Sequence, residues 1–424
     1  MATDAGLRLA RLATMLMLVA SGAGAARAQS EILVSPAGPV TRIADAVRAA
    51  EPGDRIRIAA GVYREPTIVV DKRLTLVGDG WPVIDGEGAR ALLHITADDV
   101  EVRGLVFRNV GTSFREDRSA VRVTEAARCT IADNRFIDAF FGIYLAKARD
   151  CRIANNVLRG TSASQTFSAN GIHLWYSSDV MIADNDVFGH RDGIYLEFSH
   201  RVAVERNRST GNRRYGLHFM YSDDCVYRGN EFSDNDAGVA VMYAARVEIA
   251  DNVFSEGRGA ATYGLLLKDI ADVRLERNRF LDNTTALLVD NTTRLLALRN
   301  RFDRNGWAVR LGASAQETRF EGNVFTGNTF DVSTNSTRTA ATFDGNYWDR
   351  YTGYDLDRDG VGDVPHRPVR LFAVITERFE PSIVLLGSLF VQLLEAAERL
   401  FPSLTPVSLF DASPAMRPIP PEAA

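Results

Sequence analysis

The sequence lacks the features of several common protein classes. Its 424 residues carry 49 Lys and Arg against 54 Asp and Glu, a formal net charge of −5, and no stretch is densely basic. We therefore expect no nucleic-acid partner. The two most apolar stretches, residues 12–20 and 383–394, are both too short to cross a bilayer.

The N-terminus carries the marks of an export signal. Arg8 and Arg11 come before or at the start of a short apolar stretch, and small residues stand at Ala26 and Ala28. These features predict that residues 1–28 are a cleaved signal peptide and that the mature chain is periplasmic. No paired arginines precede the apolar stretch, which favours the Sec route over the twin-arginine route.

The centre of the chain is a repeat. Four similar segments begin at Gly171, Gly193, Gly216 and Gly238, at spacings of 22, 23 and 22 residues. An asparagine recurs at a similar period, at Asn134, Asn156, Asn185, Asn207, Asn230, Asn252, Asn278, Asn300, Asn323 and Asn346. Asparagine suits a left-handed corner, and stacked asparagines can bond to one another as a ladder. The pattern predicts an all-β fold, a right-handed single-stranded parallel β-helix of about eleven coils.

The remaining segments are expected to start, close or attach this β-helix. Residues 29–95 are predicted to be an N-terminal cap with a helix followed by the first coils, and residues 96–350 the repeats. Residues 351–377 are predicted to form an acidic, calcium-like loop with closing strands. Residues 378–424 are predicted to form an apolar helix and a proline-rich tail.

Positions counted from each repeat glycine separate the interior from the surface. Offsets +1 and +3 are consistently apolar and are predicted to point inward. Offset +5 is aromatic, and core packing is the expected explanation for Tyr176, Phe198, Tyr221 and Tyr243. A further core column is predicted to hold Cys129, Cys151 and Cys225. Cys129 and Cys151 lie on adjacent coils and could be bridged, but buried free thiols are the favoured interpretation.

Offsets +2 and +4 are predicted to point outward and contain the unusual chemistry. We call the candidate metal ligands on this face the His/Met strip: His173, Glu197, His218, Met220 and Met242. Thioether and imidazole together suit Cu(I), so the strip is a candidate transient copper site. An ordinary mixed surface, or one covered by another protein, is the competing interpretation. His190 and His200 flank the strip and are expected to be solvated turn residues.

A second interpretation of the same face is carbohydrate chemistry. Tyr144, Trp175 and Tyr195 could stack on sugars, and Arg191 and Asp192 could assist a polysaccharide lyase or epimerase. A glycosidase would need two well-placed carboxylates, and only Glu197 is a clear candidate. The Asp-Pro-His motif of alginate epimerases is absent. Enzymatic activity is therefore not expected.

An acidic segment follows the last repeat. Asp355, Asp357, Asp359 and Asp363 fall at positions 1, 3, 5 and 9 of a calcium loop of the EF-hand type. Position 12 is His366, so the usual bidentate glutamate is missing. The loop predicts a structural Ca²⁺ site, with a plain acidic turn as the alternative.

The C-terminal region differs from the rest of the chain. Residues 382–401 are predicted to form one helix that is apolar around most of its circumference. Such a helix at the end of a rod is expected to dock on a partner or to lie at a membrane surface.

These features together resemble the NosD family of periplasmic proteins that act in nitrous oxide reductase maturation. The resemblance rests on the segments GIHLWYS, GIYLEFS, GLHFMYS and AVMY, on NYWDRYTGYDLDRDGVGD, and on the apolar segment before SLFDASPAMRP. It covers essentially the whole mature chain.

The resemblance implies a non-enzymatic role in copper assembly. Family members look like the periplasmic part of a complex with an ABC-type membrane permease and its ATPase. With a copper chaperone lipoprotein, such a complex helps to load copper into apo nitrous oxide reductase. The C-terminal helix would then attach to the permease, and the His/Met strip would face copper or a client protein.

Overall fold

The structure is a computed structural model. It describes residues 30–113, 115–160, 169–259, 262–336, 340–406 and 409–418. The expected signal peptide, residues 1–28, lies outside the described residues, as does most of the loop expected between Arg159 and Asn170.

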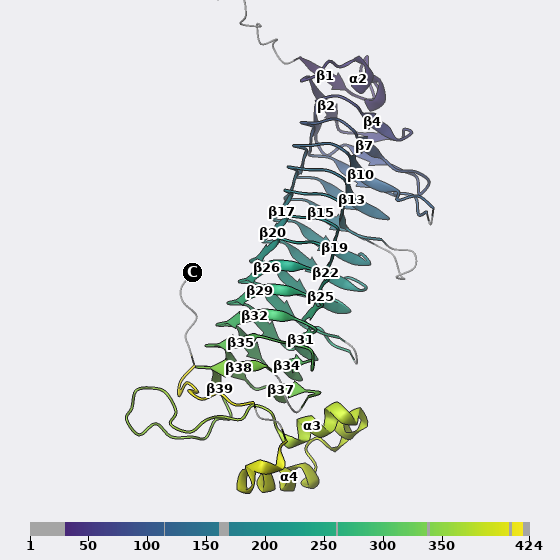
Figure 1. The fold of residues 1–424 in the computed structure, drawn as a ribbon. Coiled ribbons are helices and arrows are strands. Elements are labelled where there is room, and N and C mark those ends of the chain that lie inside the picture. Colours follow the sequence, from purple (N-terminus) through teal and green to yellow (C-terminus); the bar gives the residue numbers. More distant parts are fainter. Residues whose placement is uncertain are drawn as a thin grey trace, which may run out of the picture.

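The chain winds into a rod whose wall consists of three parallel sheets, so the predicted all-β parallel β-helix is confirmed (Figure 1). The first sheet contains β1 (Glu31–Val34), β2 (Arg55–Ala59), β5 (Thr75–Asp79), β8 (Glu101–Arg103), β11 (Thr130–Ala132), β14 (Arg152–Ala154), β17 (Met181–Ala183), β20 (Ala203–Glu205), β23 (Val226–Arg228), β26 (Ala245–Ala250), β29 (Ala271–Glu276), β32 (Thr293–Leu298), β35 (Thr318–Glu321) and β38 (Ala341–Asp344). The second sheet contains β4 (Ile68–Val70), β7 (Leu93–Ile95), β10 (Ser119–Thr124), β13 (Phe141–Ala146), β16 (Ile172–Trp175), β19 (Asp192–Glu197), β22 (Tyr215–Met220), β25 (Ala237–Met242), β28 (Leu265–Lys268), β31 (Thr285–Asp290), β34 (Trp307–Leu311) and β37 (Phe330–Thr334). The third sheet contains β3 (Val62–Tyr63), β6 (Val83–Asp85), β9 (Val106–Arg108), β12 (Arg135–Ile137), β15 (Val157–Arg159), β18 (Asp186–Phe188), β21 (Arg208–Thr210), β24 (Glu231–Ser233), β27 (Val253–Ser255), β30 (Arg279–Leu281), β33 (Arg301–Asp303), β36 (Val324–Thr326) and β39 (Tyr347–Trp348).

The rod has more coils than the expected eleven. Its three sheets hold 14, 12 and 13 strands among the described residues, which corresponds to about 13 turns. The estimate was low because the first coils lack the marker asparagine. The hydrogen-bond register places Gly61, Pro82 and Leu105 in the column that Asn134 continues.

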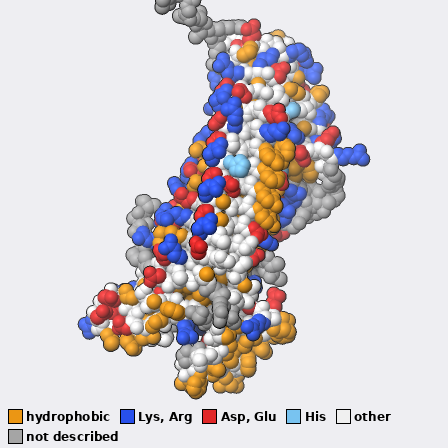
Figure 2. Space-filling view, viewed as in Figure 1, with side chains coloured by type: hydrophobic (Ala, Val, Ile, Leu, Met, Phe, Trp, Pro, Cys, Tyr) orange, Lys and Arg blue, Asp and Glu red, His pale blue; other side chains and the backbone are white. Residues whose placement is uncertain are grey.

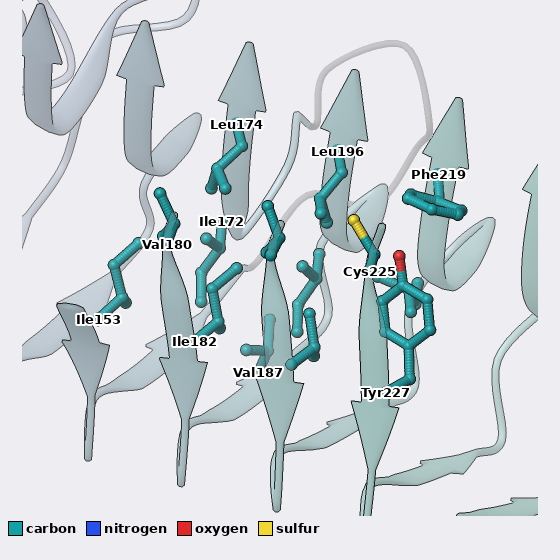
Figure 3. Packing of buried hydrophobic residues seen from close by; sticks show 14 of the residues in the cluster. Ile153, Ile172, Leu174, Val180, Ile182, Val187, Leu196, Phe219, Cys225 and Tyr227 are labelled. Atoms are coloured by element: carbon teal, nitrogen blue, oxygen red, sulfur yellow. The ribbon is translucent and has the colours of Figure 1, made fainter. Parts of the chain in front are cut away.

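The interior is filled by columns of aligned apolar side chains. Leu174, Leu196 and Phe219 point inward from the second sheet, and Val180 and Cys225 point inward from the corner before the first sheet (Figure 3). The predicted inward offsets are therefore confirmed. The three cysteines are buried free thiols, as the favoured interpretation had it.

The marker asparagines form the predicted ladder inside one corner. Asn156 Oδ1 accepts hydrogen bonds from the backbone N–H and from Nδ2 of Asn134, at 3.0 and 3.2 Å. The same pair of bonds links the later marker asparagines. The left-handed residue is the preceding one, such as Asp133 or Asn155, and not the marker itself. The marker can therefore keep its amide inside the wall, where every donor finds an acceptor.

The N-terminal end is covered by the predicted helix, α2 (Ile43–Ala49), whose Ile43, Ala46 and Val47 are buried. The carboxylate of Glu65 accepts hydrogen bonds from the backbone N–H groups of Ile43 and Ala44, at 2.7 and 3.0 Å. This carboxylate satisfies N–H groups that have no partner within a helix.

The C-terminal helix is not continuous, in contrast to the expectation for residues 382–401. Helix α3 (Leu371–Arg378) comes first, where closing strands were expected. The 3₁₀-helix η2 (Glu380–Leu385), α4 (Leu389–Leu400) and η3 (Pro402–Leu404) follow. Gly387 lies between η2 and α4 and has φ +80°. A positive φ interrupts a helix, and glycine adopts it without a steric cost, so the helical segment breaks at this residue. Helix α3 packs on β37, and α4 packs on α3 through Val391 and Leu394.

The tail beyond α4 returns to the rod rather than extending away from it. Asp411 is fully buried, and its Oδ2 accepts hydrogen bonds from the backbone N–H and Nδ2 of Asn346 and from Nε1 of Trp348, at 3.0, 2.9 and 3.0 Å. Asp411 thus occupies the position of the next marker asparagine and ends the ladder. Because α3 and α4 lie between the last coil and this tail, the helical unit is attached to the rod at both ends.

Candidate functional site

The outer face of the second sheet carries the His/Met strip in strict register. His173 pairs with Tyr195, and Tyr195 pairs with His218 on the next strand. Two residues further along the strands, Glu197 pairs with Met220 and Met220 pairs with Met242. The register of the repeats therefore brings the predicted residues onto neighbouring strands.

The outward side chains are less exposed than expected. Only 8% of His173 and 7% of His218 is exposed, and Tyr144 is also buried. The rings cover one another: ring centroids lie 4.6 Å apart for Tyr144 and His173, and 4.7 Å apart for His173 and Tyr195. Phe141 lies against Tyr144 at one end. Alternation along a strand predicts the direction of a side chain, but neighbouring side chains decide its contact with solvent.

His173 is a neutral imidazole with an unused nitrogen. Its Nδ1 lies 3.3 Å from Nδ2 of Asn170, and its Nε2 is buried without a hydrogen-bond partner among the described residues. Burial and then the positive charge of Arg191 lower the pKa of His173 to about 3. A neutral imidazole is the form that binds metals.

His218 lies against a buried carboxylate and a guanidinium. Its Nδ1 is 3.8 Å from Oδ2 of Asp192 and 3.3 Å from Nη2 of Arg214. Burial alone would raise the pKa of Asp192, but the neighbouring His218 ring and the hydrogen bonds from Arg214 outweigh it and lower the pKa. The ring stacks on Tyr195, with centroids 4.7 Å apart, and contacts Tyr215 at 4.6 Å. A carboxylate near one nitrogen of an imidazole is a common way to orient the other nitrogen toward a metal.

The two methionines complete the strip at half-buried positions. The Tyr195 hydroxyl lies 3.8 Å from Sδ of Met220, within range of a weak hydrogen bond to sulfur. Burial and then the charge of Glu197 raise the pKa of Tyr195 to about 12, so this hydroxyl keeps its proton. Paired thioethers beside an imidazole form a soft ligand set that suits Cu(I) better than Mg²⁺ or Ca²⁺.

The expectation for the flanking histidines is wrong at one of them. His200 is exposed, as expected for a turn residue. His190 is completely buried, and burial lowers its pKa to about 4. Its backbone N–H donates to Oδ1 of Asn212, at 3.1 Å, while neither ring nitrogen has a hydrogen-bond partner in the described part of the chain.

His190 belongs to a second ladder that the sequence interpretation missed. Asn235 Oδ1 accepts the backbone N–H and Nδ2 of Asn212, at 3.0 and 2.9 Å. The same bonds link Asn283, Asn305 and Asn328 further along the rod. Each of these asparagines follows a marker asparagine by five residues, a spacing that could have revealed the column.

The aromatic column at offset +5 forms a stack, but not inside the core as expected. We call Tyr176, Phe198, Tyr221 and Tyr243 the aromatic corner. Their ring centroids are 4.7, 5.1 and 4.9 Å apart along the rod. Tyr176, Tyr221 and Tyr243 are 53%, 42% and 40% exposed. A band of hydrophobic side chains is visible along the middle of the rod (Figure 2).

The acidic loop gathers three of its four predicted ligands. Carboxylate oxygens of Asp355, Asp357 and Asp359 all lie within 4.8 Å of one another. Asp363 accepts the backbone N–H of Leu356, at 2.7 Å. His366, at position 12, is half-buried with its ring centroid 5.0 Å from that of Trp348. The calcium site therefore stays a prediction, on three carboxylates and without a ligand from position 12.

The C-terminal helices present a second hydrophobic surface. We call it the C-terminal apolar patch, and it consists of the exposed residues Val384, Leu386, Leu389, Phe390, Leu393, Leu400 and Phe401. Hydrophobic side chains gather at this end of the molecule in Figure 2. Among the described residues, none of the helices has the length and hydrophobicity needed to span a membrane.

Solved structures with a similar fold include polysaccharide enzymes. The A-module of a mannuronan C-5 epimerase from Azotobacter vinelandii aligns with a TM-score of 0.59 at 15% identity, over 71% of this chain and 92% of that one. The catalytic unit of an α-1,3-glucanase from Streptomyces thermodiastaticus aligns with a TM-score of 0.56 at 15% identity, over 72% of this chain and 66% of that one. At this identity the similarity shows the fold alone.

Sequence relatives are more specific. Residues 160–353 match the model of the NosD family, described as periplasmic copper-binding protein. A protein from Stutzerimonas stutzeri, named probable ABC transporter binding protein NosD, is 27% identical over 96% of this chain and 94% of its own length. A protein of the same name from Pseudomonas aeruginosa is 31% identical over 86% of this chain and 88% of its own length. With this identity maintained over most of its length, the chain belongs to the NosD family.

Proposed function

We propose that this protein is a periplasmic copper-handling protein that acts in the maturation of nitrous oxide reductase. The family description names copper and the periplasm, and the names of both relatives refer to an ABC transporter. These names describe binding proteins, which confirms the expectation that the chain is not an enzyme.

The observation that carries the proposal is the pairing of Met220 with Met242 beside His218. Two thioethers on adjacent strands can approach one ion, because neighbouring strands lie about 4.8 Å apart. The carboxylate of Asp192 lies near Nδ1 of His218. In this proposal Cu(I) is the cargo: it arrives from a copper chaperone lipoprotein, is held by this soft set, and passes to apo nitrous oxide reductase.

The C-terminal apolar patch is the proposed contact with an ABC-type permease, whose ATPase would drive the cycle. Residues of α4 are fixed to α3 by an ion pair between Glu395 and Arg370, at 2.8 Å, and by the bond from Leu371 N–H to Glu398, at 2.9 Å. Because the helical unit is joined to the last coil on both sides, movement of the permease would tilt or twist the rod as one body.

Copper binding is tested by replacing His218, Met220 and Met242 together with alanine. We expect Cu(I) affinity, measured by competition with a coloured chelator, to fall at least tenfold, and the copper content of the reductase in cells to fall with it. The matched control is Met181→Ala, because Met181 is a half-buried methionine on the first sheet, away from the strip. Wild-type affinity and reductase copper in the triple variant would contradict the proposal.

The carbohydrate interpretation has less support in the geometry. Sugars stack on the faces of aromatic rings, but Tyr144 is buried, and the ring of Tyr195 packs between those of His173 and His218, with its centroid 4.7 Å from each. Detectable binding of an acidic polysaccharide by the purified protein would reverse this ranking.

A further inference from the structure

At one corner of the rod, the side chains change from polar to aromatic over four consecutive coils. The column at offset +5 is polar at Glu125 and Lys147, becomes the aromatic corner, and is polar again at Asp269 and Asn291. All of its residues have a positive φ, between 44° and 54°. The backbone of this corner is therefore the same in every coil, and only the side chains differ.

Aromatic residues at this corner contribute little to the stability of the fold. A left-handed conformation disfavours a residue with a bulky side chain by about 1–2 kcal/mol, whereas Asn and Asp tolerate it. Three of the four rings are 40–53% exposed, so the core gains little from them. Stacking between rings returns about 0.5–1.5 kcal/mol for each pair. Unfavourable conformation combined with exposed hydrophobic area is typical of an interaction site.

The geometry of the rings also indicates that the partner is a protein. The rings stack face to face, so that they present their edges and the tyrosine hydroxyls outward. The column is bounded by an ion pair between Glu125 and Lys147, at 2.9 Å, and by a hydrogen bond from Asn291 to Asp269. An apolar centre with a polar border is the anatomy of a protein interface. Four rungs span about 15 Å, which corresponds to a small and transient contact.

The aromatic corner is continuous with the proposed copper ligands. Tyr221 directly follows Met220, and Tyr243 directly follows Met242. A protein seated on these rings would therefore hold its own surface against the two thioethers. A short-lived contact suits ion transfer, because the donor must leave after each exchange.

We propose that the aromatic corner is the docking surface for a Cu(I)-carrying protein whose metal site is surrounded by apolar side chains. The proposal rests on the function proposed above and names the surface that positions the donor. The partner delivers its ion to Met220 and Met242 while its apolar rim lies on Tyr176, Phe198 and the following rings.

The test replaces all four rings with asparagine: Tyr176→Asn, Phe198→Asn, Tyr221→Asn and Tyr243→Asn. Asparagine accepts the left-handed backbone, so we expect a melting temperature at or above that of the wild type. Cu(I) affinity of the purified protein should stay within twofold, because the His/Met strip is intact. Affinity for the Cu(I)-loaded, lipid-free copper chaperone, measured by surface plasmon resonance, should fall at least tenfold.

The control is Trp81→Asn, which removes an aromatic residue of the same backbone type from another corner. Trp81 has φ 58° and is 41% exposed. It should leave chaperone affinity unchanged. If the fourfold variant misfolds, the single variant Tyr221→Asn is measured in the same way and is expected to weaken binding about threefold or more.

The outcomes separate this inference from the proposed function. Unchanged chaperone affinity in the ring variants would overturn the inference, whatever the metal measurements show. A ring-dependent contact with apo-reductase instead of the chaperone would overturn it too, because it would assign the surface to the acceptor. Loss of Cu(I) affinity in the ring variants would also overturn it, since the rings would then belong to the metal site. Loss of chaperone affinity in the ring variants, together with loss of Cu(I) affinity only in the variant lacking His218, Met220 and Met242, supports both proposals.

Discussion

The aromatic corner and the C-terminal apolar patch are two surfaces of exposed hydrophobic side chains that are built differently. The aromatic corner lies on the middle coils, where strand pairing on both sides determines the position of each residue. The C-terminal apolar patch lies on η2 and α4, beyond the last coil, and its position depends on a few contacts. The comparison suggests that the middle surface tolerates substitution, whereas the terminal surface depends on how the rod is closed.

The largest expected effect is at the closure itself. Asp411→Ala would leave three buried N–H donors of Asn346 and Trp348 without their acceptor. Unsatisfied buried donors cost about 1–3 kcal/mol each, so we expect a loss of about 3 kcal/mol or more. The loss should be local, since each coil contacts only its neighbours. Hydrogen exchange should therefore increase in β38, β39 and the tail but not at the aromatic corner.

The matched control for that prediction is Asp411→Asn. Its side-chain oxygen can accept the same bonds, as the marker asparagines do, and the change in unfolding free energy should stay below about 1 kcal/mol. Equal destabilisation by both variants, or increased exchange along the whole rod, would contradict the proposed role of Asp411.

The next effect concerns a middle coil. His190→Asn would extend the second asparagine ladder toward the N-terminus, where His190 now leaves both ring nitrogens unpaired in the described structure. Burial lowers the pKa of His190 to about 4, so between pH 6.5 and 4 the unfolded chain takes up a proton that the folded chain does not. Wild-type stability should fall over this window, by about 2 kcal/mol at pH 5 from this residue.

The asparagine variant should lose this part of the pH dependence. Urea denaturation at pH 7 and pH 5 measures the difference, and His200→Asn is the control because His200 is exposed. Identical pH profiles for the wild type and the His190 variant would show that His190 does not carry the effect.

The terminal surface is then tested for association rather than stability. Leu389→Ser with Leu393→Ser removes two exposed side chains of α4 and keeps the buried Val391. We expect the unfolding free energy to change by less than about 0.5 kcal/mol, as for most surface positions. Co-purification with the permease should be lost, because exposed apolar residues at the centre of an interface dominate binding. The control is Leu356→Ser, an exposed leucine in the acidic loop, which should still co-purify.

The smallest expected effect is that of calcium on the acidic loop. With three clustered carboxylates and no bidentate glutamate, we expect a dissociation constant of about 1 mM. At 10 mM Ca²⁺ the stabilisation would be about 1.4 kcal/mol. Calorimetric titration checks it, with Asp357→Asn and Asp359→Asn as the variant that should bind no ion. Equal behaviour of the variant and the wild type would favour a plain acidic turn.

Much of the rod follows from the repeat alone. Leu174, Leu196 and Phe219 are buried as their offsets predict, and Asn134 begins the ladder that the spacing indicates. The early coils were not counted from the sequence, because Gly61, Pro82 and Leu105 replace the marker asparagine without changing the strand register. Backbone pairing needs no particular side chain, so a coil can form where the motif is absent.

The candidate site was predicted in position but not in environment. The strand register placed Met220 beside Met242 and His218 beside Tyr195, as the spacing required. The contacts of His218 with Arg214 and Asp192 were not foreseen, because they depend on how side chains of adjacent coils turn toward one another. The aromatic corner was assigned to the core because apolar composition does not distinguish a buried column from an exposed one.

By itself, the sequence determined the fold class, the ladder and the residues on each face of the second sheet, because a period near 22 residues repeats the same backbone path. The tertiary structure decided which of those faces reach solvent and how the rod ends. Exposure of a corner depends on neighbouring coils, and closure depends on Asp411 meeting Asn346 across 65 residues of chain. Neither relation is periodic, so the spacing of the repeats predicts neither of them.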